Sequence, residues 1–93
     1  MMKPKRCYVG VDVCKAWLDW ATDQSKAVES VANNLEGIAC LVEALKNVRP
    51  RRVIIESTGG LELPAANALV QAGFKVAIVN PAYNPVQREQ TAN

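Results

Sequence analysis

The spacing of apolar residues changes several times along this 93-residue chain, and the order of the changes restricts the fold. Apolar residues first alternate with other residues, as in strands, and then recur every three to four residues, as in helices. The elements predicted from this spacing are strands over 6–13, 16–22 and 26–32, a helix over 35–48, a strand over 53–56, a helix over 61–72 and a strand over 74–79.

Residues that begin or end helices stand at the boundaries of these elements. Asn33-Asn34 is a candidate N-cap for the first helix, and Pro50 prevents the continuation of that helix. Gly59-Gly60 turns the chain toward the second helix, and Gly73 is a candidate C-cap. The buried stripes predicted from the spacing are Leu35, Ile38, Leu41, Val42, Leu45 and Val48 on the first helix, and Leu61, Ala65, Leu69 and Ala72 on the second.

Three meandering strands followed by helix, strand, helix and strand predict an α/β fold with a mixed five-stranded sheet. Strand 6–13 is expected at the centre, with the antiparallel meander on one side. Strands 53–56 and 74–79 are expected on the other side, parallel to it, because right-handed crossovers place their connecting helices against the sheet. The predicted domain covers residues 1–81, and the polar residues 82–93 are expected to form a tail or a frayed helix.

Composition excludes several classes of function. The chain has no histidine, which excludes Ser-His triads and most zinc sites, so a bound metal would need oxygen ligands, as Mg²⁺ and Mn²⁺ do. No apolar run approaches the ~20 residues that span a bilayer. A net charge of +2 excludes a strongly basic nucleic-acid coat. The cysteines Cys7, Cys14 and Cys40 are expected to be reduced and mostly buried, in the cytoplasm.

Two of the predicted strands carry a carboxylate at or next to their C-terminal end, Asp12 in the first and Glu56 in the fourth. Because neighbouring strands lie about 4.8 Å apart, parallel neighbours would bring these two acids close together. Two close carboxylates repel, and a divalent cation relieves the repulsion. The sequence therefore predicts that Asp12 and Glu56 are metal ligands. The alternative is that each acid lies at the solvent boundary, paired with a lysine.

The residues just after the two acids are candidates for contacts with DNA phosphates. Thr58-Gly59-Gly60 follows Glu56 and precedes a helix, and glycines let a backbone approach a phosphate closely. The same glycines also suit an ordinary strand-to-helix turn. Lys15 follows Asp12 and is the fourth candidate.

Other candidates for nucleic-acid contacts are weaker. The cluster Arg49, Arg51 and Arg52 precedes strand 53–56, so it is expected at the opposite end of the sheet from Glu56, as solvated surface. Trp17 and Trp20 could stack on bases, but they lie on opposite faces of their strand, so at least one belongs to the core.

Four segments occur in an order and spacing that resembles a known family. They are Val9-Gly10-Val11-Asp12-Val13-Cys14-Lys15, Leu18-Asp19, Val53-Ile54-Ile55-Glu56-Ser57-Thr58-Gly59-Gly60 and Val76-Ala77-Ile78-Val79-Asn80-Pro81. Together they resemble the N-terminal catalytic domain of the IS-one-ten/Piv-type DEDD transposases, over nearly all of residues 8–81. The resemblance implies a RuvC-like fold of the RNase H superfamily.

The resemblance also implies a function: transposition of an insertion sequence, through magnesium-dependent cutting and joining of DNA. Asp12 and Glu56 match the first two of the family's four catalytic acids. The other two are aspartates beyond the Asn-Pro motif, and this chain has no aspartate after Asp23. A truncated N-terminal fragment without activity of its own is therefore expected. The family's partners are DNA and a structured guide RNA.

Two alternatives stay open. An actin-like sugar kinase lobe shares the topology and the first-strand Gly-x-Asp, but Cys14-Lys15-Ala16 stands where that class has a phosphate loop. A non-catalytic module that forms homo-oligomers is the other alternative, since the missing segment would leave apolar surface uncovered.

Overall fold

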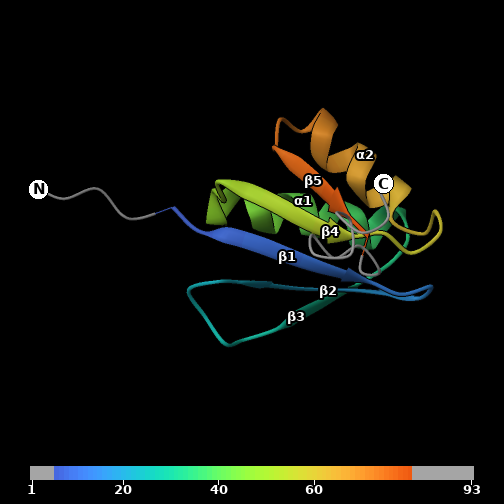
Figure 1. The fold of residues 1–93 in the computed structure, drawn as a ribbon, viewed down its shortest axis with the longest axis horizontal. Coiled ribbons are helices and arrows are strands. Elements are labelled where there is room, and N and C mark those ends of the chain that lie inside the picture. Colours follow the sequence, from blue (N-terminus) through green and yellow to red (C-terminus); the bar gives the residue numbers. More distant parts are fainter. Residues whose placement is uncertain (1–5, 81–93) are drawn as a thin grey trace, which may run out of the picture.

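A computed structural model describes residues 6–80 of the chain. It contains five strands and two helices, which follow one another in the predicted order (Figure 1). The elements are β1 (Tyr8–Val13), β2 (Trp17–Thr22), β3 (Glu29–Ala32), α1 (Leu35–Val48), β4 (Arg52–Glu56), α2 (Leu63–Gln71) and β5 (Val76–Val79). The polar segment predicted at 82–93 lies outside the described residues.

The five strands form one mixed sheet in the order β3-β2-β1-β4-β5, with β1 at the centre. β1 is antiparallel to β2, and β2 is antiparallel to β3. β4 is parallel to both β1 and β5. The α/β class and the mixed five-stranded sheet predicted from the sequence are thus confirmed.

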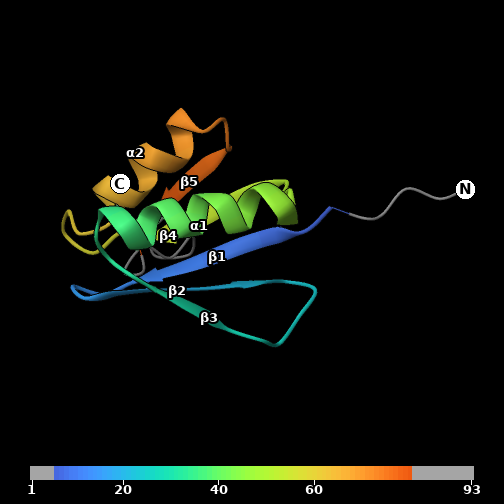
Figure 2. The ribbon, with the colours of Figure 1, turned by 180° about the vertical axis from the view of Figure 1, so that it is seen from behind.

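The core lies on one face of the sheet, between the strands and the two helices. Val9, Val11 and Val13 alternate with exposed residues along β1 and point toward the helices. Ile38, Leu41 and Leu45 of α1 and Ala65, Ala66 and Leu69 of α2 complete this core. In Figure 1 α1 lies behind the sheet, and in Figure 2, seen from the other side, it lies in front.

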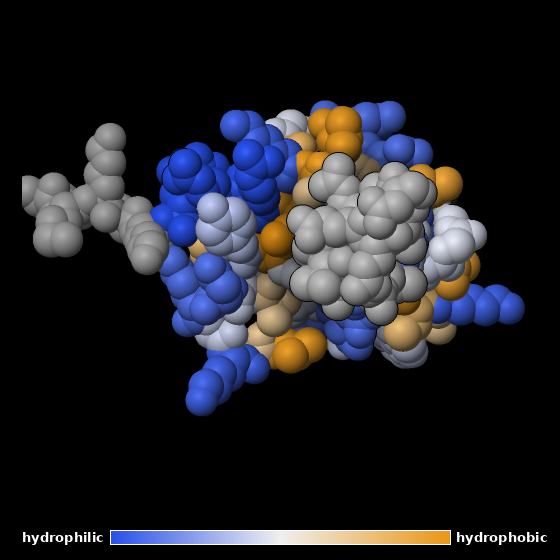
Figure 3. All heavy atoms as spheres, viewed as in Figure 1, coloured by the Kyte–Doolittle hydropathy of each residue, from blue (hydrophilic) through white to orange (hydrophobic). Residues whose placement is uncertain are grey.

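We call the opposite side of the sheet the open face. No helix among residues 6–80 packs against it, and Figure 3 looks onto it. Strand alternation and register place the following residues there: Tyr8, Gly10 and Asp12 of β1, Trp17, Asp19 and Ala21 of β2, Ser30 and Ala32 of β3, Arg52, Ile54 and Glu56 of β4, and Ala77 and Val79 of β5.

The helix stripes were predicted only in part. Leu35 is 87% exposed, because it is the first residue of α1 and a helical side chain leans toward the N-terminus, here past the end of the helix. Leu61 is exposed because α2 begins only at Leu63, and Ala72 is exposed because it is the C-cap.

The predictions for the cysteines and for the start of three strands also need correction. Cys7 is buried, but Cys14 follows β1 in an exposed turn and Cys40 lies on the exposed side of α1, so most of the thiols are accessible. β1, β3 and β5 begin two to three residues later than predicted, at Tyr8, Glu29 and Val76. Before β5, the Lys75 carbonyl still accepts a hydrogen bond from the Val53 N–H of β4.

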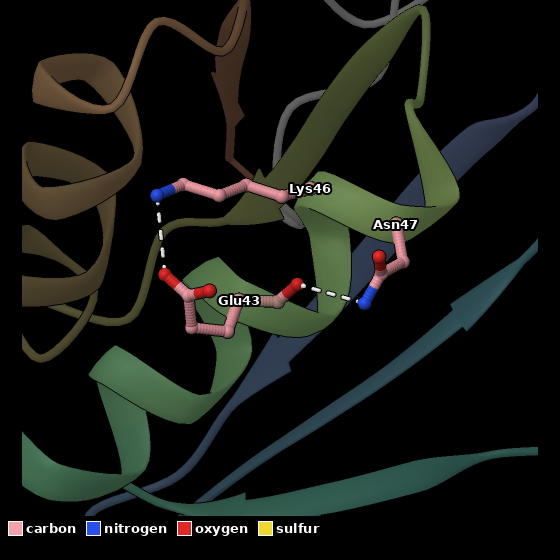
Figure 4. Close-up of polar contacts among 3 residues, drawn as sticks. All are labelled: Glu43, Lys46 and Asn47. Carbon is pink, nitrogen blue, oxygen red and sulfur yellow. Dashed lines mark hydrogen bonds and ion pairs between the residues drawn. The ribbon is translucent and has the colours of Figure 1, made fainter.

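The exposed side of α1 carries polar contacts of small energetic weight (Figure 4). Lys46 Nζ lies 3.1 Å from a carboxylate oxygen of Glu43, and the Asn47 side chain donates to the Glu43 carbonyl. Such an exposed pair on a helix contributes about 0.3–0.5 kcal/mol.

Among residues 6–80, no helix is both long and apolar enough to cross a membrane.

The first turn of α1 is held by its cap, as the sequence predicts. The Asn34 side chain accepts a hydrogen bond of 2.8 Å from the Gly37 N–H. Replacing Asn34 with Ala should lower the free energy of unfolding by about 1 kcal/mol, because that N–H loses its partner. Urea denaturation measures the change. Asn47→Ala is the control, since the Asn47 side chain makes only a long hydrogen bond of 3.4 Å to the Glu43 carbonyl. Equal losses of unfolding free energy in both variants would contradict the role of Asn34 as a cap.

Candidate functional site

Asp12 and Glu56 lie on neighbouring parallel strands, both on the open face. The register pairs Val11 with Ile55, so the next position along each strand brings Asp12 level with Glu56. Neighbouring strands lie about 4.8 Å apart. Both acids line the same hollow, which has a volume of ≈ 460 Å³. The structure therefore brings together the two acids that the sequence singled out.

A third carboxylate, Asp19 of β2, lines the same hollow. Asp19 is the direct cross-strand partner of Asp12 in the antiparallel β1–β2 pair. Its carboxylate accepts a hydrogen bond from the Ser30 hydroxyl of β3. Strand alternation already places Asp19 on the same face as Asp12, but only the register shows that the two residues are opposite each other. Asp19 was missing from the sequence-predicted site for that reason.

The hollow is acidic, and none of the residues among 6–80 that line it is a cation that could balance its charge. Besides Asp12, Asp19 and Glu56, its lining consists of small and apolar residues such as Gly10 and Ile54. Within residues 6–80, neither the Asp12 nor the Glu56 carboxylate accepts a hydrogen bond or forms an ion pair, so the alternative in which a lysine neutralises each acid has no support there. The same residues include no group of three His, Cys, Asp or Glu side chains placed to hold a metal ion.

The loop between Glu56 and α2 is organised by a buried acid, Glu62, which is only 5% exposed. Its Oε1 accepts three hydrogen bonds: from the Thr58 N–H at 2.9 Å, the Thr58 hydroxyl at 3.1 Å and the Gly60 N–H at 3.1 Å. Gly59 and Gly60 have φ values of 74° and 111°, which other residues adopt only with strain. The glycines therefore allow the loop to curl around the carboxylate.

These hydrogen bonds stabilise the ionised form of Glu62 and lower its pKa to about 2. The Thr58 N–H contributes most, followed by the backbone N–H of Glu62 itself. Burial opposes the shift, and the Gly60 N–H and the Thr58 hydroxyl add to it. At neutral pH the loop is thus built around a negative charge.

Glu62 affects the contacts with DNA predicted at Thr58, Gly59 and Gly60. The N–H groups of Thr58 and Gly60 already have the Glu62 carboxylate as their acceptor. A phosphate at this loop would meet that charge as well as the donors. The signal in the sequence was an acid two residues after the glycine pair, at the helix start, where a carboxylate is favoured.

Lys15 lies in the exposed turn between β1 and β2, next to the C-terminal end of β1. Asn33 ties this turn to the loop before α2, since its side-chain amide donates to the carbonyls of Cys14, at 2.9 Å, and Leu61, at 3.5 Å. Asp12, Lys15 and the loop after Glu56 therefore share one end of the sheet. The sequence indicated Asn33 only as part of the helix cap.

The two tryptophans separate as the alternation predicts. Trp20 belongs to the core, and Trp17 is 55% exposed on the open face. Trp17 is thus an aromatic side chain available on the same face as Asp12 and Glu56.

In comparison with known proteins, the chain matches no protein-family model and no curated protein.

Proposed function

We propose that this chain is part of a DNA transposase of an insertion sequence, with an RNase H-like domain of the RuvC type. Asp12 and Glu56 would be the first two carboxylates of its metal site. The observation that carries the proposal is the position of these two acids, level with each other on adjacent parallel strands, in one hollow and without partners among residues 6–80.

The order of the strands supports the same proposal. An antiparallel meander joined to a parallel pair, with β1 central, is the arrangement expected of an RNase H-like sheet, and here it comes with both helices on one face. Ligands of open α/β sheets gather at the carboxyl ends of parallel strands, where Asp12 and Glu56 lie. In this proposal the protein is a cytoplasmic recombinase that acts as a homo-oligomer. It binds DNA and a guide RNA, and Lys15 lies near the DNA strand that is cut.

The carboxylate oxygens of Asp12 and Glu56 meet part of the coordination that a hard divalent cation needs. Asp12 and Glu56 supply oxygen ligands and negative charge, which Mg²⁺ and Mn²⁺ prefer. When bound, such ions activate a nucleophile and stabilise the leaving oxygen in phosphodiester cleavage. Two carboxylates leave most of the roughly six positions around Mg²⁺ to water, so binding should be weak. Asp19 is held by Ser30 beside this pair and adds to the negative charge of the hollow.

Binding of Mn²⁺ tests the proposal directly. In ¹⁵N NMR spectra of the full chain, substoichiometric Mn²⁺ should broaden the amides around residues 12, 19 and 56. The double variant Asp12→Asn/Glu56→Gln should lose at least about tenfold in Mn²⁺ affinity, because the hollow then loses two of its three charges. Glu43→Gln, on the exposed side of α1, is the control and should leave the broadening unchanged.

Activity supplies a second readout. We expect the chain alone not to nick supercoiled DNA in Mg²⁺, because its two carboxylates leave the ions under-coordinated. Broadening centred away from Asp12 and Glu56, or broadening that persists in the double variant, would contradict the proposal. Magnesium-dependent nicking that the double variant retains would point to a different site.

A further inference from the structure

A second hollow, of ≈ 270 Å³, lies at the other end of the sheet and is strongly basic. Arg6 precedes β1, Arg51 directly precedes β4, Arg52 is the first residue of β4, and Lys75 directly precedes β5. Among residues 6–80, these four cations line the hollow together with Pro50, Gly73 and Phe74, and no carboxylate lines it. Figure 3 shows the strongly hydrophilic surface gathered at this end, on the left of the view.

One of the four cations is held in place by the backbone. The Arg6 guanidinium donates to the carbonyl of the buried Pro50 at 3.1 Å. A guanidinium has five N–H donors, so this bond leaves most of them for a ligand. Arg6 is thereby oriented at the hollow, and less side-chain entropy is lost when it binds an anion.

The cations are not needed to satisfy the helix ends nearby. The helix carbonyls at the ends of α1 and α2 accept backbone N–H groups: Arg49 donates to Leu45, and Ala72 donates to Ala68. None of the four cations forms an ion pair within residues 6–80, where the salt bridge that does occur is Lys46–Glu43, outside the hollow. Four like charges without a counter-charge raise the local potential and attract anions.

The position of this hollow relative to the carboxylates indicates which anion it suits. Arg52 and Glu56 both lie on the open face of β4, four residues apart, which corresponds to about 13 Å along a strand. Duplex DNA carries one phosphate on each strand for every ~3.4 Å of helix axis, so a span of this length along the axis equals about four base pairs. A nucleic-acid strand lying along the open face would meet cations at one end and the acidic pair at the other.

From these observations we infer that the basic hollow binds backbone phosphates of a DNA strand that runs along the open face toward Asp12 and Glu56. The choice of DNA rests on the proposed function, whereas the phosphate chemistry rests on the four cations. Guanidinium groups bind phosphate oxygens in pairs, and Lys75 adds a point charge. The hollow positions the strand without reading its sequence, because phosphate contacts carry no base information.

Salt dependence of DNA binding tests the inference. Fluorescence anisotropy of a labelled duplex of about 20 base pairs, with EDTA present, gives the slope of log K against log salt between about 50 and 200 mM KCl. The variant Arg51→Gln/Lys75→Gln should lower the steepness of that slope by about 2, since each lost phosphate contact removes about one unit. Arg51→Lys, which keeps the charge, should keep the slope of the unmodified chain.

The control removes the same charge elsewhere. Lys26→Gln/Lys46→Gln changes residues outside the hollow and should alter the slope by less than about half a unit. Equal slopes in both double variants, or no DNA binding at the lowest salt, would each overturn the inference. Because EDTA removes the metal, these outcomes are separate from the Mn²⁺ test, which decides the proposed function.

Discussion

Replacing Gly37 with Ala is expected to destabilise the fold by about 3 kcal/mol, the upper end of the usual cost of overpacking. Gly37 lies in the first turn of α1, directly against the end of β3. A Cβ added there would overlap the carbonyl oxygen of Ala32 and come within 2.6 Å of its carbonyl carbon. A backbone cannot rotate away as a side chain can, so α1 would have to shift from the sheet.

The sign of this effect separates packing from helix propensity. In an exposed helix interior, Gly→Ala stabilises by about 1 kcal/mol. Here the clash should win, and thermal unfolding followed by circular dichroism should show a fall in Tm of roughly 10–20 °C. Gly10→Ala is the control, because within residues 6–80 no atom outside the chain neighbours of Gly10 lies within 4 Å of a Cβ built there. A Tm of the Gly37 variant equal to or above that of the unmodified chain would show that α1 is not seated on Ala32.

The sequence predicted the elements and the sheet order, because both depend on patterns of neighbouring residues. Val9, Val11 and Val13 alternate, and Ile38, Leu41 and Leu45 follow the helical repeat, so both faces could be identified. Predictions failed at the ends of the elements. Leu35 and Leu61 fit the spacing of a buried stripe, but they lie where the helix has just begun or has not begun.

The residues of the candidate site could be predicted only where the pattern that marks them lies within a single strand. Asp12 and Glu56 each end an apolar run, and strand adjacency brings them together. Glu62 and Asn33 gave no comparable signal, because their partners are backbone groups whose positions depend on the loop conformation. The basic hollow could not be predicted either. It joins Arg6, residues 50–52 and residues 73–75, which come together only when β1, β4 and β5 align in parallel.

Replacing Glu62 with Gln is expected to weaken the fold most at neutral pH and least in acid. The folded pKa of Glu62, about 2, lies below its ordinary value of 4.5. The unfolded chain therefore takes up a proton at a higher pH than the folded chain, and the stability that the ionised carboxylate provides is complete above about pH 4.5. That stability is lost as the pH falls from 4.5 through about 2. The Gln variant cannot show this loss, because its side chain carries no charge at any pH.

The difference in urea midpoint between the unmodified chain and Glu62→Gln should thus be largest at pH 6–7 and should shrink steadily below pH 4.5. Glu29→Gln removes an equal charge from an exposed strand residue and should change the midpoint little at any pH. The amide signals of Thr58 and Gly60, which donate to the carboxylate, should also shift in the Gln variant at neutral pH. A pH-independent difference in midpoint would mean that Glu62 contributes by its shape and packing. In that case the loop after Glu56 would not depend on an internal negative charge for its stability.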